Sequence, residues 1–277
     1  MKRRDLLKAG AAAALAPAAL RASRASSGRL KQSVARWCYA KIPIEDLCRS
    51  AAEMGITGMD LVAPKDWPVL RRYGITPTMV QGAGTFKVGW NDPTAHAKLE
   101  EEARASIVRA AAANVPNVIT LFGTRRGRGE EEGIDNCIKG LNRVKKFAED
   151  NGVTLCIELL NSKVDHEDYQ GDHTSFGTAV IKGVDSPRVK LLYDAYHMQI
   201  MEGDLIRTIR DNIQYIAHFH VAGVPGRHEI DESQEVQWHT VARAIADLDF
   251  PGYIAQEFVP ARDPNASMKQ AVKILTV

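Results

Sequence analysis

The stretch Leu191-Leu-Tyr-Asp-Ala-Tyr-His-Met-Gln-Ile200 carries the pattern from which the fold is interpreted. The bulky residues at 189–193 form a block that is too short for a helix, so they predict a buried strand. Asp194 follows where that strand should end, and His197 comes three residues later. Because a carboxylate beside a buried strand is costly without a charged partner, this position predicts a functional site.

Three other predicted strands end in the same way. They are Leu155-Cys-Ile-Glu158, Ile216-Ala-His-Phe-His220 and Tyr253-Ile-Ala-Gln-Glu257. About one strand–helix unit separates each polar end from the next. In a barrel of parallel strands the carboxyl ends of the strands surround one mouth. We therefore expect Glu158, Asp194, His220 and Glu257 to converge on one side of such a mouth.

Strands and helices alternate along residues 30–277. Strands are expected at 33–40, 56–62, 75–80, 117–122, 153–158, 189–193, 213–221 and 251–257. Helices are expected between them, for example at 43–54, 92–113 and 238–248, with one ending at Asp150 and one beginning near Glu202. This alternation predicts an α/β protein whose catalytic domain, residues 30–277, is a single (β/α)8 TIM barrel. The rival, an open doubly wound sheet, needs a Gly-rich turn after its first strand, and Ala40-Lys-Ile-Pro43 is not one.

Residues 1–25 have a different composition. A basic head with Arg3 and Arg4 precedes a weakly apolar segment at 9–20, and small residues near Ala25 would suit a peptidase. This pattern predicts a cleaved export signal of the twin-arginine type and a periplasmic location. If the leader is not functional, the protein stays in the cytoplasm. No segment approaches ~18 consecutive apolar residues, so no membrane anchor is expected.

The charge of the chain argues against a nucleic-acid partner. The leader holds six Lys or Arg and one Asp, so its removal changes the formal net charge from +2 to −3. The remaining body lacks the basic excess that nucleic-acid binders use. The four cysteines form no Cys-x-x-Cys pair and are expected to be free thiols.

The four converging side chains would make an oxygen-rich ligand set. Three carboxylates and one imidazole suit one divalent metal ion, Mn²⁺ or Mg²⁺, with Co²⁺ or Zn²⁺ as alternatives. For any single carboxylate the competing interpretation is a helix cap or a pair with a nearby Lys. Four such residues in register on consecutive strands favour the metal site. His218 also points into the barrel and is expected to be a hydrogen-bonded interior residue.

Three segments carry a family resemblance. They are Cys156-Ile-Glu158-Leu-Leu-Asn161-Ser-Lys163, Leu192-Tyr-Asp194-Ala-Tyr-His197 and His218-Phe-His220-Val-Ala-Gly-Val-Pro225-Gly-Arg227-His-Glu229. They resemble hydroxypyruvate isomerase, a family of the xylose-isomerase-like barrels that include the ketose 3-epimerases. The likeness is dense from about residue 150 to 258 and general before that.

The resemblance implies a role for each matching residue. Glu158, Asp194, His220 and Glu257 would hold one divalent metal. Glu158 and Glu257 would also serve as the catalytic acid/base pair. The substrate-binding residues would be His197 and Arg227, with Lys163 and Glu229 as further candidates. Lys163 and His166 lie in a long predicted loop, for which simple solvation is the competing interpretation.

The implied reaction converts a small hydroxy-keto acid, hydroxypyruvate, into tartronate semialdehyde (2-hydroxy-3-oxopropanoate) through an enediolate. The leader and His220 favour the alternative, an isomerase or epimerase of a keto-sugar or 3-keto-glycoside outside the cytoplasm. An abasic-site phosphodiesterase of the same fold would need additional His ligands and a basic surface. A non-catalytic sugar-binding protein would not need both glutamates. A homo-oligomer is compatible with the sequence.

Overall fold

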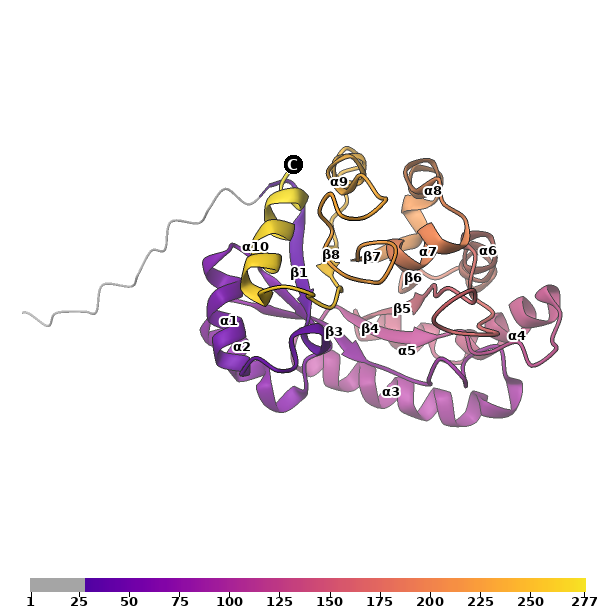
Figure 1. Cartoon of the computed structure of the whole chain (residues 1–277). Helices are drawn as coiled ribbons and strands as arrows, with labels where there is room; N and C mark the ends of the chain where they lie inside the picture. Colours follow the sequence, from indigo (N-terminus) through magenta and orange to yellow (C-terminus); the bar gives the residue numbers. More distant parts are fainter. Residues whose placement is uncertain (1–27) are drawn as a thin grey trace, which may run out of the picture.

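The computed structural model describes residues 28–277, so the predicted export signal at 1–25 lies outside the described residues. Eight parallel strands close into one barrel in chain order, with β8 pairing to β1, and the helices surround them (Figure 1). The predicted (β/α)8 TIM barrel is confirmed. The strands are β1 (Lys31–Ala35), β2 (Gly58–Asp60), β3 (Thr76–Gln81), β4 (Asn117–Leu121), β5 (Thr154–Glu158), β6 (Val189–Asp194), β7 (Ile216–Val221) and β8 (Tyr253–Gln256).

The helices differ from the expected pattern mainly after β4 and β6. They are α1 (Ile44–Glu53), α2 (Trp67–Arg72), α3 (His96–Ala112), α4 (Glu130–Asn142), α5 (Lys145–Asp150), α6 (Thr174–Val184), α7 (Ala195–Met201), α8 (Leu205–Asn212), α9 (Trp238–Ala246) and α10 (Pro264–Leu275). The single helix expected before residue 150 is two helices, α4 and α5. The helix expected near Glu202 is preceded by α7, which begins directly after β6 because the Asp194 side chain accepts hydrogen bonds from the backbone N–H groups of Tyr196 and His197.

The first strand is also shorter than expected. It ends at Ala35, and residues Arg36–Tyr39 form a 3₁₀ helix instead of continuing the strand. Trp37 lies on this turn at the carboxyl end of β1, with 43% of its surface exposed. The correction matters for the site, because it places an indole ring at the mouth of the barrel and not in a strand.

The barrel interior contains every second residue of each strand. Cys156 and Leu192 form a small apolar cluster there with Met79 and Ile119. Two residues further along β5 and β6, the same inward face carries Glu158 and Asp194. The strand register therefore moves from an apolar layer to an ionisable layer at the carboxyl ends.

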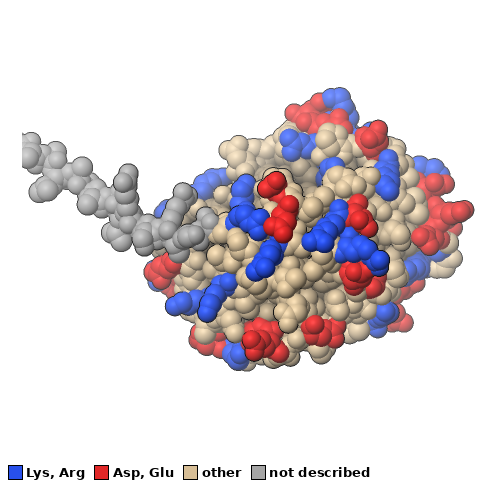
Figure 2. Space-filling model, turned by 90° about the horizontal axis from the view of Figure 1, so that it is seen from above, with Lys and Arg blue, Asp and Glu red and all other residues tan. Residues whose placement is uncertain are grey.

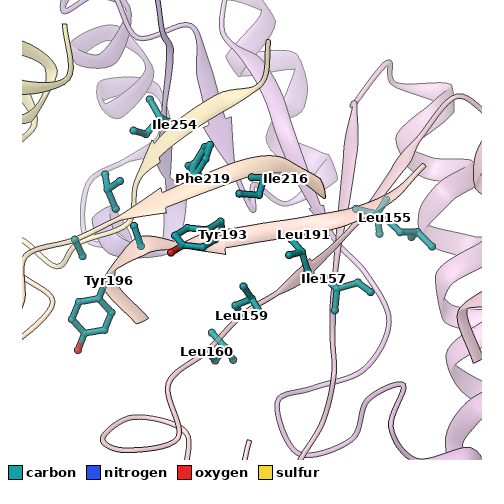
Figure 3. Packing of buried hydrophobic residues seen from close by; sticks show 14 of the residues in the cluster. Leu155, Ile157, Leu159, Leu160, Leu191, Tyr193, Tyr196, Ile216, Phe219 and Ile254 are labelled. Atoms are coloured by element: carbon teal, nitrogen blue, oxygen red, sulfur yellow. The ribbon is translucent and has the colours of Figure 1, made fainter. Parts of the chain in front are cut away.

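The opposite face of the strands packs against the surrounding helices. Leu191 and Tyr193 of β6 and Phe219 of β7 belong to the large buried cluster shown in Figure 3. The Tyr193 and Phe219 rings have centroids 5.8 Å apart, and Phe219 makes an edge contact with Phe250 at 4.8 Å. This apolar layer fixes the strands whose ends carry the ionisable side chains.

Two other sequence predictions concern the described residues. All four cysteines are free, as predicted, with Cys38 partly exposed and the other three buried. Within residues 28–277, the helices are all too short or too polar to cross a membrane.

Shortening Leu191 should destabilise the fold measurably. Its side chain is fully buried, so Leu191→Ala should lower the free energy of unfolding by about 2–5 kcal/mol. Thermal melting followed by circular dichroism measures this as a lower Tm. The matched control is Val108→Ala on α3, where the side chain is 52% exposed and the change should stay within about 0.5 kcal/mol. Equal shifts for the two variants would contradict the assigned packing.

Candidate functional site

Four ionisable side chains meet at the carboxyl ends of consecutive strands. Glu158 ends β5, Asp194 ends β6, His220 lies near the end of β7, and Glu257 directly follows β8. One ligand-type atom from each lies within 4.8 Å of those of the others, and all four residues are buried. The structure thus brings together the complete set expected from the sequence.

His220 is at the centre of this group. Its Nδ1 lies 2.8 Å from Glu257 Oε2 and 3.3 Å from Glu158 Oε1. Asp194 pairs with His220 across the β6–β7 register. The Nδ1 atom is buried and has no hydrogen-bond partner within the part of the chain that the structure describes. A buried nitrogen facing carboxylates in this way has the position of a metal ligand.

The other nitrogen of His220 is held by a residue that the sequence reasoning missed. Asp60, at the end of β2, has its Oδ2 atom 3.1 Å from His220 Nε2 and 2.6 Å from His218 Nε2. The hydroxyl groups of Ser33 and Thr78 donate to Asp60 Oδ1. Asp60 thus accepts the Nε2 proton of His220, so Nδ1 is the nitrogen that would bind a cation after losing its own proton, the usual arrangement behind a metal-bound imidazole.

The sequence contained a signal for Asp60. It closes a short buried strand, as Asp194 does, but no His follows it and its strand is brief. The expectation for His218 is met, because its ring is fully buried and hydrogen-bonded to Asp60. A second group of ligand-type residues lies within 4.8 Å of one another and consists of Asp60, His218 and His220. This group supports the first one, because Asp60 is hydrogen-bonded to the ring of His220.

Burial and neighbouring charges set the protonation of the site. Burial raises the pKa of Asp194 above its ordinary value, against the opposing effect of Arg227. Burial also acts to raise the pKa of Glu257, but the cationic His220 and Arg227 lower it overall. For His220 burial acts to lower the pKa, yet the carboxylates of Glu257 and Asp60 raise it well above the usual range. The carboxylates therefore require positive charge at this position.

Arg227 and Trp37 complete the mouth. Arg227 Nη2 donates to Asp194 Oδ2 at 3.1 Å and to Glu257 Oε2 at 2.5 Å. Its guanidinium stacks over the rings of Tyr196 and Trp37, 5.0 and 5.6 Å from their centroids. Trp37 Nε1 donates to Glu257 Oε1 at 2.8 Å. Sequence reasoning identified Arg227 as a candidate for substrate binding.

His197 joins the site through α7. Its Nε2 is 2.7 Å from Arg227 Nη1, and its Nδ1 is 2.6 Å from Asn161 Nδ2. Burial, followed by the positive charge of Arg227, lowers the pKa of His197 well below its ordinary value, so the ring is neutral. An Asn161 amide N–H faces Nδ1 and an Arg227 guanidinium N–H faces Nε2, and the neutral ring can accept a hydrogen bond from only one of these two donors.

Two predicted substrate-binding residues lie elsewhere. The Lys163 ammonium donates to the backbone carbonyls of Ile200 and Met201 at 2.9 and 3.1 Å, where it neutralises the C-terminal end of α7. Glu229 accepts hydrogen bonds from Ser267 and from two backbone N–H groups of the loop before α10. In this structure both side chains hold loops, and the role of Lys163 and Glu229 in substrate binding stays a prediction.

The donor set fits a divalent cation. Three buried carboxylates, an imidazole nitrogen without a hydrogen bond and a carboxylate that fixes the imidazole tautomer satisfy the requirements of such an ion. The groups are arranged to hold one metal ion. On the outer surface seen in Figure 2, acidic and basic side chains are interspersed, unlike the continuous basic surface of nucleic-acid binders.

Removing the charge of Asp60 should weaken metal binding. In Asp60→Asn the Ser33 and Thr78 hydroxyls would hold the amide oxygen, so the amide N–H₂ would face His220 Nε2 and force the proton onto Nδ1. Mn²⁺ affinity measured by titration calorimetry should fall about 10–100-fold. The control is Asp46→Asn, an exposed carboxylate on α1. Wild-type affinity in a folded Asp60→Asn protein would show that Asp60 does not orient His220.

The sequence matches known proteins over most of its length. The family description "Xylose isomerase-like TIM barrel" matches residues 48–276. A 2-oxo-tetronate isomerase of Pectobacterium atrosepticum is 26% identical over 238 residues, 80% of this chain and 88% of that protein. A protein of Danio rerio named "Putative hydroxypyruvate isomerase" is 28% identical over 135 residues, so the match spans about half the length of each.

Solved structures agree on the fold. The 3-keto-D-glucoside 4-epimerase of E. coli superposes with a TM-score of 0.71 at 18% identity, covering 89% of this chain and 98% of that one. The architecture, the strand-end ligand set and the match over residues 48–276 point to the same group of enzymes. The chain belongs to the xylose isomerase-like TIM-barrel family and is an isomerase.

Proposed function

We propose that this enzyme interconverts an α-hydroxy ketone and its isomeric hydroxy-aldehyde, with hydroxypyruvate and 2-hydroxy-3-oxopropanoate as the substrate pair. The observation that carries the proposal is the placement of Glu158 and Glu257 beside His220 Nδ1, at 3.3 and 2.8 Å. Two carboxylates beside one cation site can remove and return a proton at neighbouring carbons. The relatives named hydroxypyruvate isomerase and 2-oxo-tetronate isomerase support the substrate class.

The cation site has a defined chemical task in this reaction. A divalent ion held by Glu158, Asp194, His220 and Glu257 would stabilise negative charge that develops on the two adjacent oxygens of the substrate. Mn²⁺ and Mg²⁺ fit the carboxylate-rich set best. The buried position of all four side chains keeps bulk water away, so this stabilisation is stronger than it would be in solution.

The proton transfer needs no external oxidant or reductant. A carboxylate takes a proton from C3 of hydroxypyruvate, and the electron pair forms the C2–C3 double bond of an enediolate. The proton returns at C2, while the hydroxyl proton passes from O3 to O2. Glu257 is held by Trp37 and Arg227, whereas the only contact of the Glu158 carboxylate with a charged group in the described residues is His220. We assign the acid/base steps to this pair.

Arg227 and His197 supply substrate recognition. The guanidinium of Arg227 can bind the carboxylate of hydroxypyruvate in a forked contact. His197 is neutral, so its single ring N–H can donate to a substrate oxygen. In the present arrangement both ring nitrogens face N–H donors, Asn161 at 2.6 Å and Arg227 at 2.7 Å, and the ring can accept from only one of them. Arg227 therefore gains by turning toward an anionic substrate.

Substituting either glutamate should stop the reaction. Glu158→Gln and Glu257→Gln keep the shape of the side chain but cannot accept a proton, so kcat should fall by roughly 10²–10⁴-fold. The value of kcat is measured with the Mn²⁺-loaded enzyme. With the Mg²⁺-loaded enzyme, proton NMR in D₂O follows the loss of the C3 hydrogens of hydroxypyruvate. The control is Glu101→Gln, an exposed residue of α3. Absence of both product and deuterium uptake in wild-type enzyme would reject hydroxypyruvate as substrate.

A second candidate function is the isomerisation or epimerisation of a keto-sugar or 3-keto-glycoside. Two carboxylates that flank a bound substrate would also allow a proton to leave one face of a carbon and return to the other. The structural likeness to 3-keto-D-glucoside 4-epimerase and the predicted leader support this alternative. Incubation of ketoses in D₂O separates the two functions, because only a true substrate gains deuterium.

We also propose that the enzyme is exported through its twin-arginine leader. Changing Arg3 and Arg4 together to Lys should retain the positive charge but remove the motif. Immunoblots of periplasmic and cytoplasmic fractions should then show the protein only in the cytoplasm. Cytoplasmic retention of the unchanged protein would reject export.

A further inference from the structure

A separate hollow lies beside the catalytic cluster. Its volume is about 330 Å³, and its lining includes Phe86, Lys87, Arg126, Asp165, His166 and Glu167. These residues come from the loops that follow β3, β4 and β5, so the hollow opens at the same end of the barrel as the ionisable cluster. The proposed isomerisation of hydroxypyruvate uses none of these side chains.

A row of rings joins this hollow to the catalytic residues. The Phe86 and His166 rings have centroids 5.3 Å apart, and His166 lies 5.3 Å from His197. His197 in turn contacts Arg227 at 2.7 Å. The hollow therefore lies two ring contacts away from His197, whose own ring is fully buried, so a ligand that reaches from Arg227 to Phe86 would pass over the partly exposed His166. A three-carbon acid held at Arg227 is too short to do so.

The charges in the hollow favour a neutral ligand. Lys87 and Arg126 contribute two positive charges, and Asp165 and Glu167 contribute two negative charges. The side chains of Lys87 and Glu167 make no hydrogen bond or ion pair with another residue of the described range 28–277. The hollow thus offers both donors and acceptors without a net charge. Hydroxyl groups both donate and accept, so a polyhydroxylated molecule satisfies this lining better than an anion does.

His166 and Phe86 add the features of a sugar platform. Burial lowers the pKa of His166, so its ring is neutral, and its Nδ1 atom is buried without a hydrogen-bond partner in the described part of the chain. Phe86 is 44% exposed, although a large apolar side chain usually gains by burial. An exposed aromatic face beside neutral polar groups can pack against the C–H face of a sugar ring.

The loop that carries Phe86 is held firmly. The backbone N–H groups of Trp90 and Asn91 donate to the carbonyls of Leu121 and Phe122 at the end of β4. Gly89 lies so close that an added Cβ would come within 2.3 Å of Leu121 O. Arg126 Nη2 also donates to the Lys87 carbonyl at 3.0 Å. The platform is thus preorganised, which reduces the entropy cost of binding.

We propose that this hollow is an outer subsite for a neutral sugar unit, through which the enzyme also accepts a ketose that carries a second ring. The inference rests on the proposed isomerase chemistry and extends its substrate class. The keto group would lie at the cation site, next to Arg227. The second ring would pack on Phe86 and exchange hydrogen bonds with His166, Lys87 and Glu167.

The test compares a long and a short substrate. Isomaltulose is a disaccharide whose fructose unit keeps its ketone, and hydroxypyruvate serves as the short probe. Deuterium uptake in D₂O gives kcat/KM for both. In Phe86→Ala the ratio of the isomaltulose value to the hydroxypyruvate value should fall about tenfold. Phe86→Tyr, which keeps the ring, should restore the ratio, and Val259→Ala, an exposed apolar residue after β8, should leave it unchanged.

The possible results separate the two proposals. Turnover of hydroxypyruvate without any exchange in isomaltulose would overturn the outer subsite and leave the isomerase function standing. An equal loss for both substrates in Phe86→Ala would also overturn it, because the ring would then serve only the common site. No exchange in either probe would reject the proposed reaction, and the subsite would fall with it.

Discussion

The position of every functional side chain follows from one constraint. Alternate residues of a strand point to opposite faces, and a closed barrel has a single interior. Leu191 and Tyr193 therefore pack against the helices, while Leu192 and Asp194 face inward. A shift of one residue would exchange the two faces. The apolar outer layer, which resists such a shift, is thus what holds the ionisable layer in place.

The same geometry buries negative charge that nearby cationic side chains must compensate. Three carboxylates are buried at one end of the barrel, and burial alone would favour their neutral forms. The positive charges of His220 and Arg227 outweigh the effect of burial on Glu257. They lower its pKa, so that carboxylate is ionised. Asp60 is hydrogen-bonded to Nε2 of His220 and so fixes Nδ1 as the nitrogen that faces the other ligands.

The sequence was sufficient for the barrel and for the four converging residues, because strand-end polarity and period-two spacing are local signals. It was insufficient for side chains whose partners are distant along the chain. Asp60 meets His220 across 160 positions. Lys163 reaches the end of α7. Glu229 accepts a hydrogen bond from the backbone of the loop before α10. The family resemblance made Lys163 and Glu229 candidates for substrate contact, and the tertiary structure adds the loop contacts that their side chains make.

Arg227 also bears on how this end of the barrel can fold. Its guanidinium donates to both Asp194 and Glu257, so it acts as an internal counter-ion for two buried carboxylates. A polypeptide with such a counter-ion can fold without leaving those carboxylates uncompensated. A cation bound by the same carboxylates would compete with the guanidinium for their negative charge, so the affinity of the site for an ion would depend on the position of one side chain.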